Sequence, residues 1–217
     1  NLTYYLKTKG KISGGTWASF INSLISPMPI IEKRKSTSVK NKKIFYSHRF
    51  KKWALSFPVI DKYIVMKSSR SFKEYGENFS FSEYLLLPSF FSALILILGI
   101  TSVAILSKFK FFRRLLLAYL PSGSGPNKEE RESHWFKVVV VGKSDKDEVT
   151  TTIRGKDPGY GETSKFISEM ALCILLQKDQ LIKDSGILTP VECTGELMLK
   201  RLLDAGISIE VAVNEKS

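Results

Sequence analysis

The most constraining feature of the chain is an uncharged run of 22 residues at positions 85–106, LLLPSFFSALILILGITSVAIL. Built as one helix, it would be about 33 Å long, close to the roughly 30 Å hydrocarbon core of a bilayer. It is apolar on every face and lies mid-chain, so it is neither a typical surface helix nor a removable signal peptide. We therefore predict a hydrophobic membrane segment over residues 84–120, with lipid contacts from Leu85, Phe90, Leu94, Leu96, Ile100, Ile105, Phe109 and Phe112.

Positive charge is concentrated before and inside this segment, and the whole chain has a formal charge of +12. Residues 1–83 hold 16 basic and 5 acidic side chains, residues 84–125 hold 4 basic and no acidic ones, and residues 126–217 hold 13 and 16. Such clustering is typical of a surface that attracts anionic lipids, of a solvated loop, or of a nucleic-acid-binding surface. No zinc-ligand, helix-turn-helix or RNA-binding signature accompanies it, so we expect no nucleic-acid partner.

The amino-terminal part of the sequence predicts a strand followed by a helix. Residues 2–9 are rich in β-formers, and a Ser-Gly-Gly turn then opens a helix at 16–25, which two prolines end. Residues 32–52 are basic and rich in Ser and Lys, which is typical of an exposed loop. A more apolar stretch follows, and its pattern over residues 61–66 fits a buried strand or a buried helix without deciding between them.

Residues 108–121 predict a second helix next to the apolar run. Phe109, Phe112, Leu115, Leu116 and Tyr119 recur at helical spacing, and four cations lie in its first turns. This pattern is typical of a helix in a membrane interface, and also of a helix that docks on a core face. A Ser/Gly-rich connector follows it.

The last ninety or so residues have the pattern of a compact domain. Residues 134–142 and 148–155 predict a hairpin, and residues 160–177 predict a helix with one apolar face. Thr194 is expected to cap a further helix that ends at a glycine, and residues 207–213 form a closing strand.

The reactive side chains predict no catalytic cluster and no metal site. The two cysteines, Cys173 and Cys193, have neither metal-ligand nor disulfide-framework spacing, which favours a reducing compartment. The two histidines, His48 and His134, are far apart and are expected at the surface or in loops. No acid/base pair stands out, so the catalytic residues stay unassigned.

Four sequence runs carry a resemblance to a known family: KTKGKISGGTWASF (7–20), PSGSGPNKEERESHWFKV (121–138), GYGETSKFISEMAL (159–172) and GILTPVECTGELMLKRLLDAGI (186–207). In order and spacing they resemble the carboxy-terminal half of saccharopine dehydrogenase-like oxidoreductases. This family includes membrane- and lipid-droplet-associated relatives of saccharopine reductase and of bacterial trans-acting enoyl reductases.

The resemblance implies an α/β fold, in the form of an α+β substrate-side domain with an antiparallel or mixed sheet that carries an inserted hydrophobic membrane helix. Residues 1–31 would begin this domain, residues 32–83 would be a basic, partly loop-like insertion, and residues 121–217 would complete the domain after the hydrophobic segment. The chain begins at Asn1 with a strand-like run, so we expect it to be a piece of a longer protein.

The resemblance also implies NAD or NADP as a cofactor, bound by an upstream Rossmann domain. No G-x-G-x-x-G motif follows a strand in this chain, so no cofactor-binding residue is expected within it. The implied function is that of an NAD(P)-dependent oxidoreductase at a membrane or lipid-droplet surface, acting on a lipid-like substrate. The alternative is a non-catalytic membrane or lipid-droplet interaction module, and a homo-oligomer is possible in either case.

Two helix starts supply the candidate substrate-side residues, which are Gly14, Gly15 and Thr16 in the first and Gly159, Tyr160 and Thr163 in the second. Free backbone N–H groups at a helix start suit a polar ligand, and the Tyr160 hydroxyl can donate to a carbonyl. The structural alternative is that the glycines permit tight turns and that the tyrosine packs.

The hydrophobic segment has three possible topologies. A single span would separate the first strand from the later strands, which the resemblance places in one domain, and positive charge flanks both ends of the segment. Both observations favour a monotopic insertion, with the chain entering and leaving from one side, over a span or a buried core helix or oligomer contact. We expect the protein to face the cytosol on a lipid droplet, the endoplasmic reticulum or the mitochondrial membrane.

Overall fold

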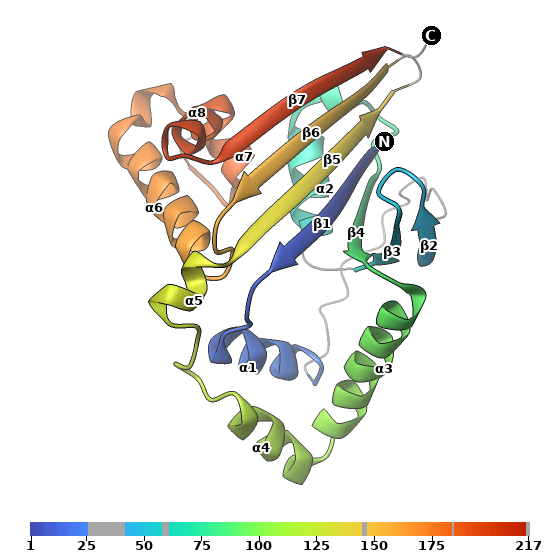
Figure 1. Ribbon diagram of the computed structural model, residues 1–217. Helices are drawn as coiled ribbons and strands as arrows, with labels where there is room; N and C mark the ends of the chain where they lie inside the picture. Colours follow the sequence, from blue (N-terminus) through green and yellow to red (C-terminus); the bar gives the residue numbers. More distant parts are fainter. Residues whose placement is uncertain (26–41, 58–60, 145–146, 184, 216–217) are drawn as a thin grey trace.

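A seven-stranded mixed sheet is the centre of the computed structural model, with strand order β2-β3-β4-β1-β5-β6-β7 (Figure 1). The structure describes residues 1–25, 42–57, 61–144, 147–183 and 185–215. β1 runs parallel to β4, and all other neighbouring strands are antiparallel. The expected mixed α/β class is confirmed. The strands are β1 (Leu2–Lys9), β2 (Ile44–Ser47), β3 (Lys52–Ser56), β4 (Phe81–Leu87), β5 (Trp135–Lys143), β6 (Asp147–Gly155) and β7 (Ser208–Glu215).

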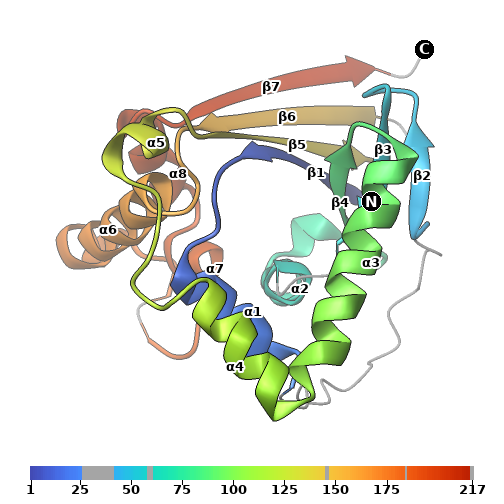
Figure 2. The same ribbon diagram turned by 60° about the horizontal axis from the view of Figure 1, so that its bottom comes forward.

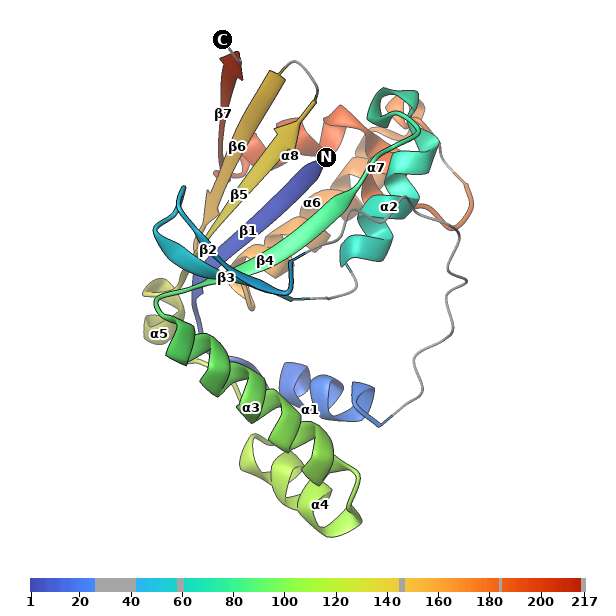
Figure 3. The same ribbon diagram turned by 90° about the vertical axis from the view of Figure 1, so that its right-hand side faces the viewer.

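The helices form two groups. One group covers a single face of the sheet and contains α2 (Asp61–Ser71), α6 (Gly161–Leu176), α7 (Pro190–Thr194) and α8 (Glu196–Asp204) (Figure 3). The other lies beyond one end of the sheet and contains α1 (Gly14–Ser23), α3 (Phe90–Ser107) and α4 (Lys110–Tyr119) (Figure 2). The short elements are α5 (Lys128–Glu132), η1 (Lys73–Tyr75) and η2 (Lys178–Gln180).

An apolar row crosses the helix-covered face of the sheet. Paired residues on neighbouring strands share a face because side chains alternate along each strand. The register therefore aligns one residue from each of six strands: Leu55, Leu85, Leu6, Val138, Ile153 and Ile209. The β2–β3 hairpin folds over the opposite face, where Phe50 and Tyr84 contact the Tyr5 ring.

The prediction of one continuous helix from Leu85 is wrong. Leu85, Leu86 and Leu87 are the last residues of β4, where Leu85 pairs with Leu6 of β1 and Leu55 of β3. Ser89 then caps α3 through a capping box with Ser92. The apolar helix is thus 18 residues long. β4 also crosses the expected domain boundary between residues 83 and 84; the domain division itself stays a prediction.

Part of the loop expected over residues 32–52 is a strand instead, whereas residues 48–51 do form a turn. Residues 26–41 lie outside the described residues, but β2 forms at Ile44–Ser47 and pairs with β3. The undecided residues 61–66 are helical, because they begin α2. The expected first strand, the β5–β6 hairpin, α6 and the closing strand are confirmed, with small shifts of their ends.

The role expected for Thr194 is also wrong. Thr194 is the last residue of α7, and its hydroxyl donates to the Pro190 carbonyl at 2.9 Å. Gly195, with a φ of 54°, separates α7 from α8, so no side chain caps α8. Thr189 caps α7 instead, through a capping box with Glu192.

The carboxylate of Glu192 connects α7 to α2. It is buried, accepts from the Thr189 backbone N–H at 2.7 Å and from the Ser71 hydroxyl, and lies 3.6 Å from the Lys67 ammonium. Because these donors favour the ionised form, hydrogen bonds from Ser71 and Thr189 lower the pKa of Glu192 to about 2.

We expect the stabilising effect of Glu192 to disappear in acid. Its pKa falls from the ordinary value of 4.5 to about 2 on folding, so its contribution is present above pH 4.5 and is lost as the pH falls towards 2. In urea unfolding, the stability difference between the wild type and Glu192→Gln should therefore shrink over this pH range. The matched control is Glu210→Gln at the exposed Arg154 pair. A pH-independent difference for Glu192→Gln would contradict the assignment.

Candidate functional site

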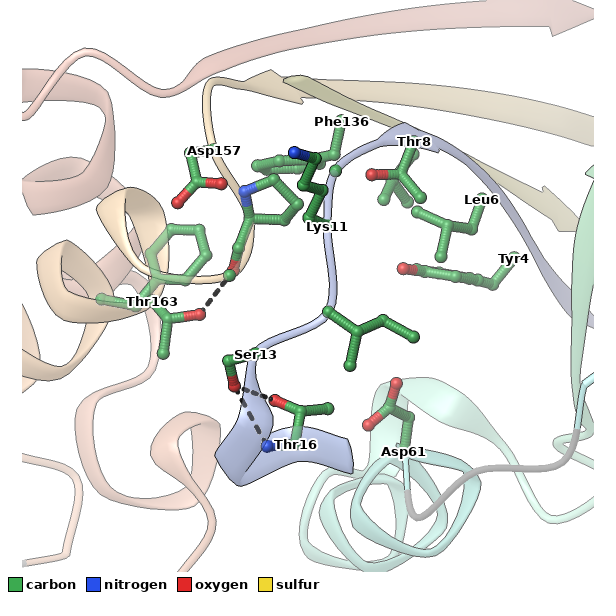
Figure 4. A pocket seen from close by; sticks show the side chains of 16 residues that line it. Tyr4, Leu6, Thr8, Lys11, Ser13, Thr16, Asp61, Phe136, Asp157 and Thr163 are labelled. Atoms are coloured by element: carbon green, nitrogen blue, oxygen red, sulfur yellow. Dashed lines mark hydrogen bonds between the residues drawn. The ribbon is translucent and has the colours of Figure 1, made fainter. Parts of the chain in front are cut away.

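A cleft of about 820 Å³ opens on the helix-covered face of the sheet, at the end of β1 (Figure 4). Tyr4, Leu6 and Thr8 of β1 form its floor together with Phe136 and Val138 of β5. The starts of three helices surround this floor. The other lining residues are Gly10, Lys11, Ile12, Ser13, Thr16, Asp61, Asp157, Pro158, Gly159, Thr163 and Phe166.

The Tyr4 phenol and the Asp61 carboxyl line one side of the cleft, and the Glu83 carboxyl lies behind them without lining it. The parallel β1–β4 register places Glu83 beside Tyr4, and Asp61 begins α2 on the facing wall. Figure 4 shows the Tyr4 hydroxyl and the Asp61 carboxylate projecting into the same space. The Glu83 Oε2 atom is buried and has no hydrogen-bond partner among the described residues.

The environment of this group favours a protonated Glu83. Burial raises the pKa of Glu83 to about 7, and the charge of Asp61 and a hydrogen bond with it act in the same direction. Burial, followed by the charge of Glu83, raises the pKa of Tyr4 to about 12. A carboxyl that exchanges a proton near neutral pH is suited to general acid/base chemistry, and the sequence alone did not reveal it.

His134 lies in the loop between α5 and β5, as one of the two expected placements has it, but it is not at the surface. His134 is 6% exposed, and its Nδ1 lies 2.8 Å from the Asp157 carboxylate. The other Asp157 oxygen accepts the backbone N–H groups of Tyr160 and Gly161 at 2.8 and 2.9 Å. Although burial opposes ionisation, these hydrogen bonds and that of His134 lower the pKa of Asp157. The pair therefore fixes the start of α6 at the cleft wall.

Three of the residues predicted from sequence line the cleft, namely Thr16, Gly159 and Thr163. The Thr16 hydroxyl bonds to that of Ser13 at 2.9 Å, and the Thr163 hydroxyl donates to the Pro158 carbonyl at 2.7 Å (Figure 4).

The other three predicted residues do not line the cleft. A Cβ at Gly14 would overlap the Pro121 carbonyl, so Gly14 permits close packing of residues 121–125. The Gly14 N–H and the Tyr160 hydroxyl both donate to the Ser124 carbonyl, at 2.9 and 3.5 Å. Gly15 is exposed in the first turn of α1.

The arrangement provides a largely apolar floor, a few hydroxyl groups and, around them, the charged side chains of Lys11, Asp61 and Asp157. Within the described part of the chain, no group of three His, Cys, Asp or Glu side chains is placed to hold a metal ion. The apolar floor of the cleft, with polar groups around it, has the composition typical of a small-molecule site.

Comparison with known proteins finds similarity to proteins that are named as oxidoreductases. The chain is 33% identical over 132 residues to a protein of Arabidopsis thaliana named as a probable mitochondrial saccharopine dehydrogenase-like oxidoreductase, a match that covers 51% of this chain and 29% of the relative. Over this matched part the chain is similar to a saccharopine dehydrogenase-like oxidoreductase. This confirms the resemblance seen in the sequence.

Bacterial relatives agree with this relationship. A trans-acting enoyl reductase of Mycobacterium leprae is 29% identical over 145 residues, covering 62% of this chain and 34% of the relative. That of Mycobacterium bovis is 26% identical over 155 residues, covering 66% and 37%. No protein-family model and no solved structure matches the chain. The matched part spans about a third of the length of these relatives, which fits a carboxy-terminal half.

We expect Glu83 to lower the stability of the protein above neutral pH. Its pKa rises from 4.5 to about 7 on folding, so no penalty exists below pH 4.5 and the penalty grows as the pH rises through 7. Glu83→Gln should then be more stable than the wild type at about pH 8, by on the order of 1 kcal/mol after solvent screening, and equal to it near pH 4. Thermal unfolding measures this, with exposed Glu77→Gln as the control. An equal effect at both pH values would refute the assignment.

Proposed function

We propose that this chain is the substrate-side, carboxy-terminal part of an NAD(P)-dependent oxidoreductase, whose nucleotide would be held by a Rossmann domain upstream. The observation that carries the proposal is the cleft, where Tyr4 and Asp61 line the wall beside an apolar floor and the protonatable Glu83 lies next to Tyr4 on the neighbouring strand. The named activities of the relatives support the oxidoreductase class.

The residues at the cleft are suited to supply the proton that a reduction needs, because the cofactor supplies only the hydride. A bound nicotinamide supplies a hydride to one atom of a polarised double bond, and the other atom then needs a proton. Glu83, which is about half protonated near pH 7, would be the source of that proton, and Tyr4 and Asp61, which line the cleft beside it, would lie between it and a bound molecule. Leu6, Val138 and the other floor residues would exclude water.

Cofactor binding separates the oxidoreductase proposal from its alternative, a non-catalytic membrane or lipid-droplet module. In titration calorimetry, the longer protein with its upstream sequence should bind NADH or NADPH, whereas residues 1–217 alone should bind neither, because the glycine-rich phosphate loop is absent from their sequence. If the longer protein also binds neither nucleotide, the oxidoreductase proposal fails and a non-catalytic membrane or lipid-droplet module is favoured.

We also propose that the protein works on the surface of a membrane or lipid droplet, on a lipid-like substrate. Among the described helices, α3 is long and apolar enough to enter a membrane, and most of its side chains are exposed. Lys108, Lys110 and Arg114 lie exposed where α3 gives way to α4. The large exposed apolar side chains here are Phe90, Phe91, Leu94, Ile95, Ile97, Leu98, Ile105, Phe109, Phe111, Phe112, Leu115 and Tyr119.

The sheet supports a monotopic arrangement. β4 leads into α3 and β5 follows α4, yet both strands pair with β1. A bilayer crossing between them would separate strands that share one ladder of hydrogen bonds, whereas a shallow helical hairpin would not. A cytosol-facing lipid droplet, endoplasmic reticulum or mitochondrial surface is compatible with this arrangement, and the Arabidopsis relative is named as mitochondrial.

Basic residues should strengthen binding to anionic membranes. Lys110 and Arg114 are four positions apart on α4 and are both exposed, and each basic residue near the surface contributes about 1 kcal/mol. Lys110→Ala/Arg114→Ala should therefore weaken binding to phosphatidylserine-containing vesicles about 30-fold in flotation assays. The matched control, Lys178→Ala/Lys200→Ala, removes two exposed cations elsewhere and should bind as the wild type does. Equal loss in both variants would count against an α4 contact.

A further inference from the structure

A second concave space, a groove of about 590 Å³, lies between the sheet and the helices α6, α7 and α8. Ile153 of β6 and Ile209 of β7 are on its sheet side, and Met170 of α6 and Met198 and Leu199 of α8 line its helix side. None of its thirteen lining residues is charged: Ile153, Phe166, Ile167, Met170, Pro190, Val191, Thr194, Gly195, Met198, Leu199, Leu202, Ile207 and Ile209.

The groove offers almost no hydrogen bonds to an occupant. Its one lining hydroxyl, that of Thr194, is already bonded to the Pro190 carbonyl. A polar ligand would lose its bonds to water there without replacement, so the occupant must be apolar. The volume lies within the range of small-molecule pockets, and two flexible methionines allow the walls to adapt.

The groove adjoins the cleft described above. Val138, on the floor of the cleft, is paired across the sheet with Ile153, on the floor of the groove. Phe166 lines both spaces and stands at the boundary between them. The apolar row of the sheet therefore continues without a polar break from the cleft into the groove.

We propose that the groove is the subsite for a single hydrocarbon chain of the substrate, whose polar, reacting end lies in the cleft. The inference rests on the proposed function because the two spaces share one ligand. Continuity with the cleft favours a substrate tail over a second copy of this chain, because a protein surface on the groove would leave the connection at Phe166 unexplained.

Binding of a fatty-acid series tests the subsite. For octanoate, dodecanoate and hexadecanoate at submicellar concentrations, calorimetry should show affinity rising with chain length, by up to about fourfold per methylene until the groove is filled. An affinity that does not depend on length overturns the proposal. No nicotinamide is present in this measurement, so its failure is distinct from a failure of the oxidoreductase assignment.

Two matched variants locate the binding. Leu199 and Leu203 both lie on α8 and are both 45% exposed, but only Leu199 lines the groove. Leu199→Glu should weaken hexadecanoate binding by about tenfold or more, while Leu203→Glu stays within about twofold of the wild type. Val191→Trp, at a second half-exposed lining position, should also weaken binding by filling the groove, and it replaces Leu199→Glu if that variant unfolds.

The outcomes that overturn the proposal are specific. Equal losses in the Leu199 and Leu203 variants would place the fatty acid elsewhere, for example on the exposed face of α3. Conversion of a dimer to a monomer by Leu199→Glu, with hexadecanoate affinity unchanged, would make the groove an interface between copies of this chain.

Discussion

The pairing of β1 with both β4 and β5 is the interaction on which the rest of the structure depends. It joins a strand at the start of the chain to strands on either side of the hydrophobic helices. The same register places Tyr4 beside Glu83 and aligns Leu6 with Val138, so it builds both the polar side and the apolar floor of the cleft. If β1 were displaced by one residue, Tyr4 and Leu6 would turn to the opposite face of the sheet and leave Glu83 and Val138 without these neighbours.

Local signals in the sequence were sufficient for much of the fold. The β5–β6 hairpin and α6 follow from short-range patterns of apolar side chains and turn residues. Leu85 was assigned wrongly because hydropathy does not separate a buried strand from a buried helix, and its pairing with Leu6 joins residues far apart in the chain. β2 was missed because it lies within a basic, loop-like stretch of sequence. It is a strand because it pairs with β3, which in turn pairs with β4.

The candidate site was predicted only in part. Thr16, Gly159 and Thr163 were found because small and hydroxyl residues at helix starts are visible in sequence. Glu83 and Asp61 were missed because only the packing of α2 against β4 brings them together. The Asp157 cap had a visible signal, an aspartate followed by Pro-Gly just before a helix, but its burial with His134 had none.

The helix α1 connects two parts of the molecule that the sequence keeps separate. Ser13 and Thr16, at its start, form part of the cleft wall, while the indole N–H of Trp17 donates to the Leu116 carbonyl of α4 at 2.6 Å. A ten-residue helix is rigid over this distance, so its contacts do not move independently. The hydrophobic hairpin and the cleft wall therefore share one helix, so a displacement of α4 that α1 follows would also move Ser13 and Thr16.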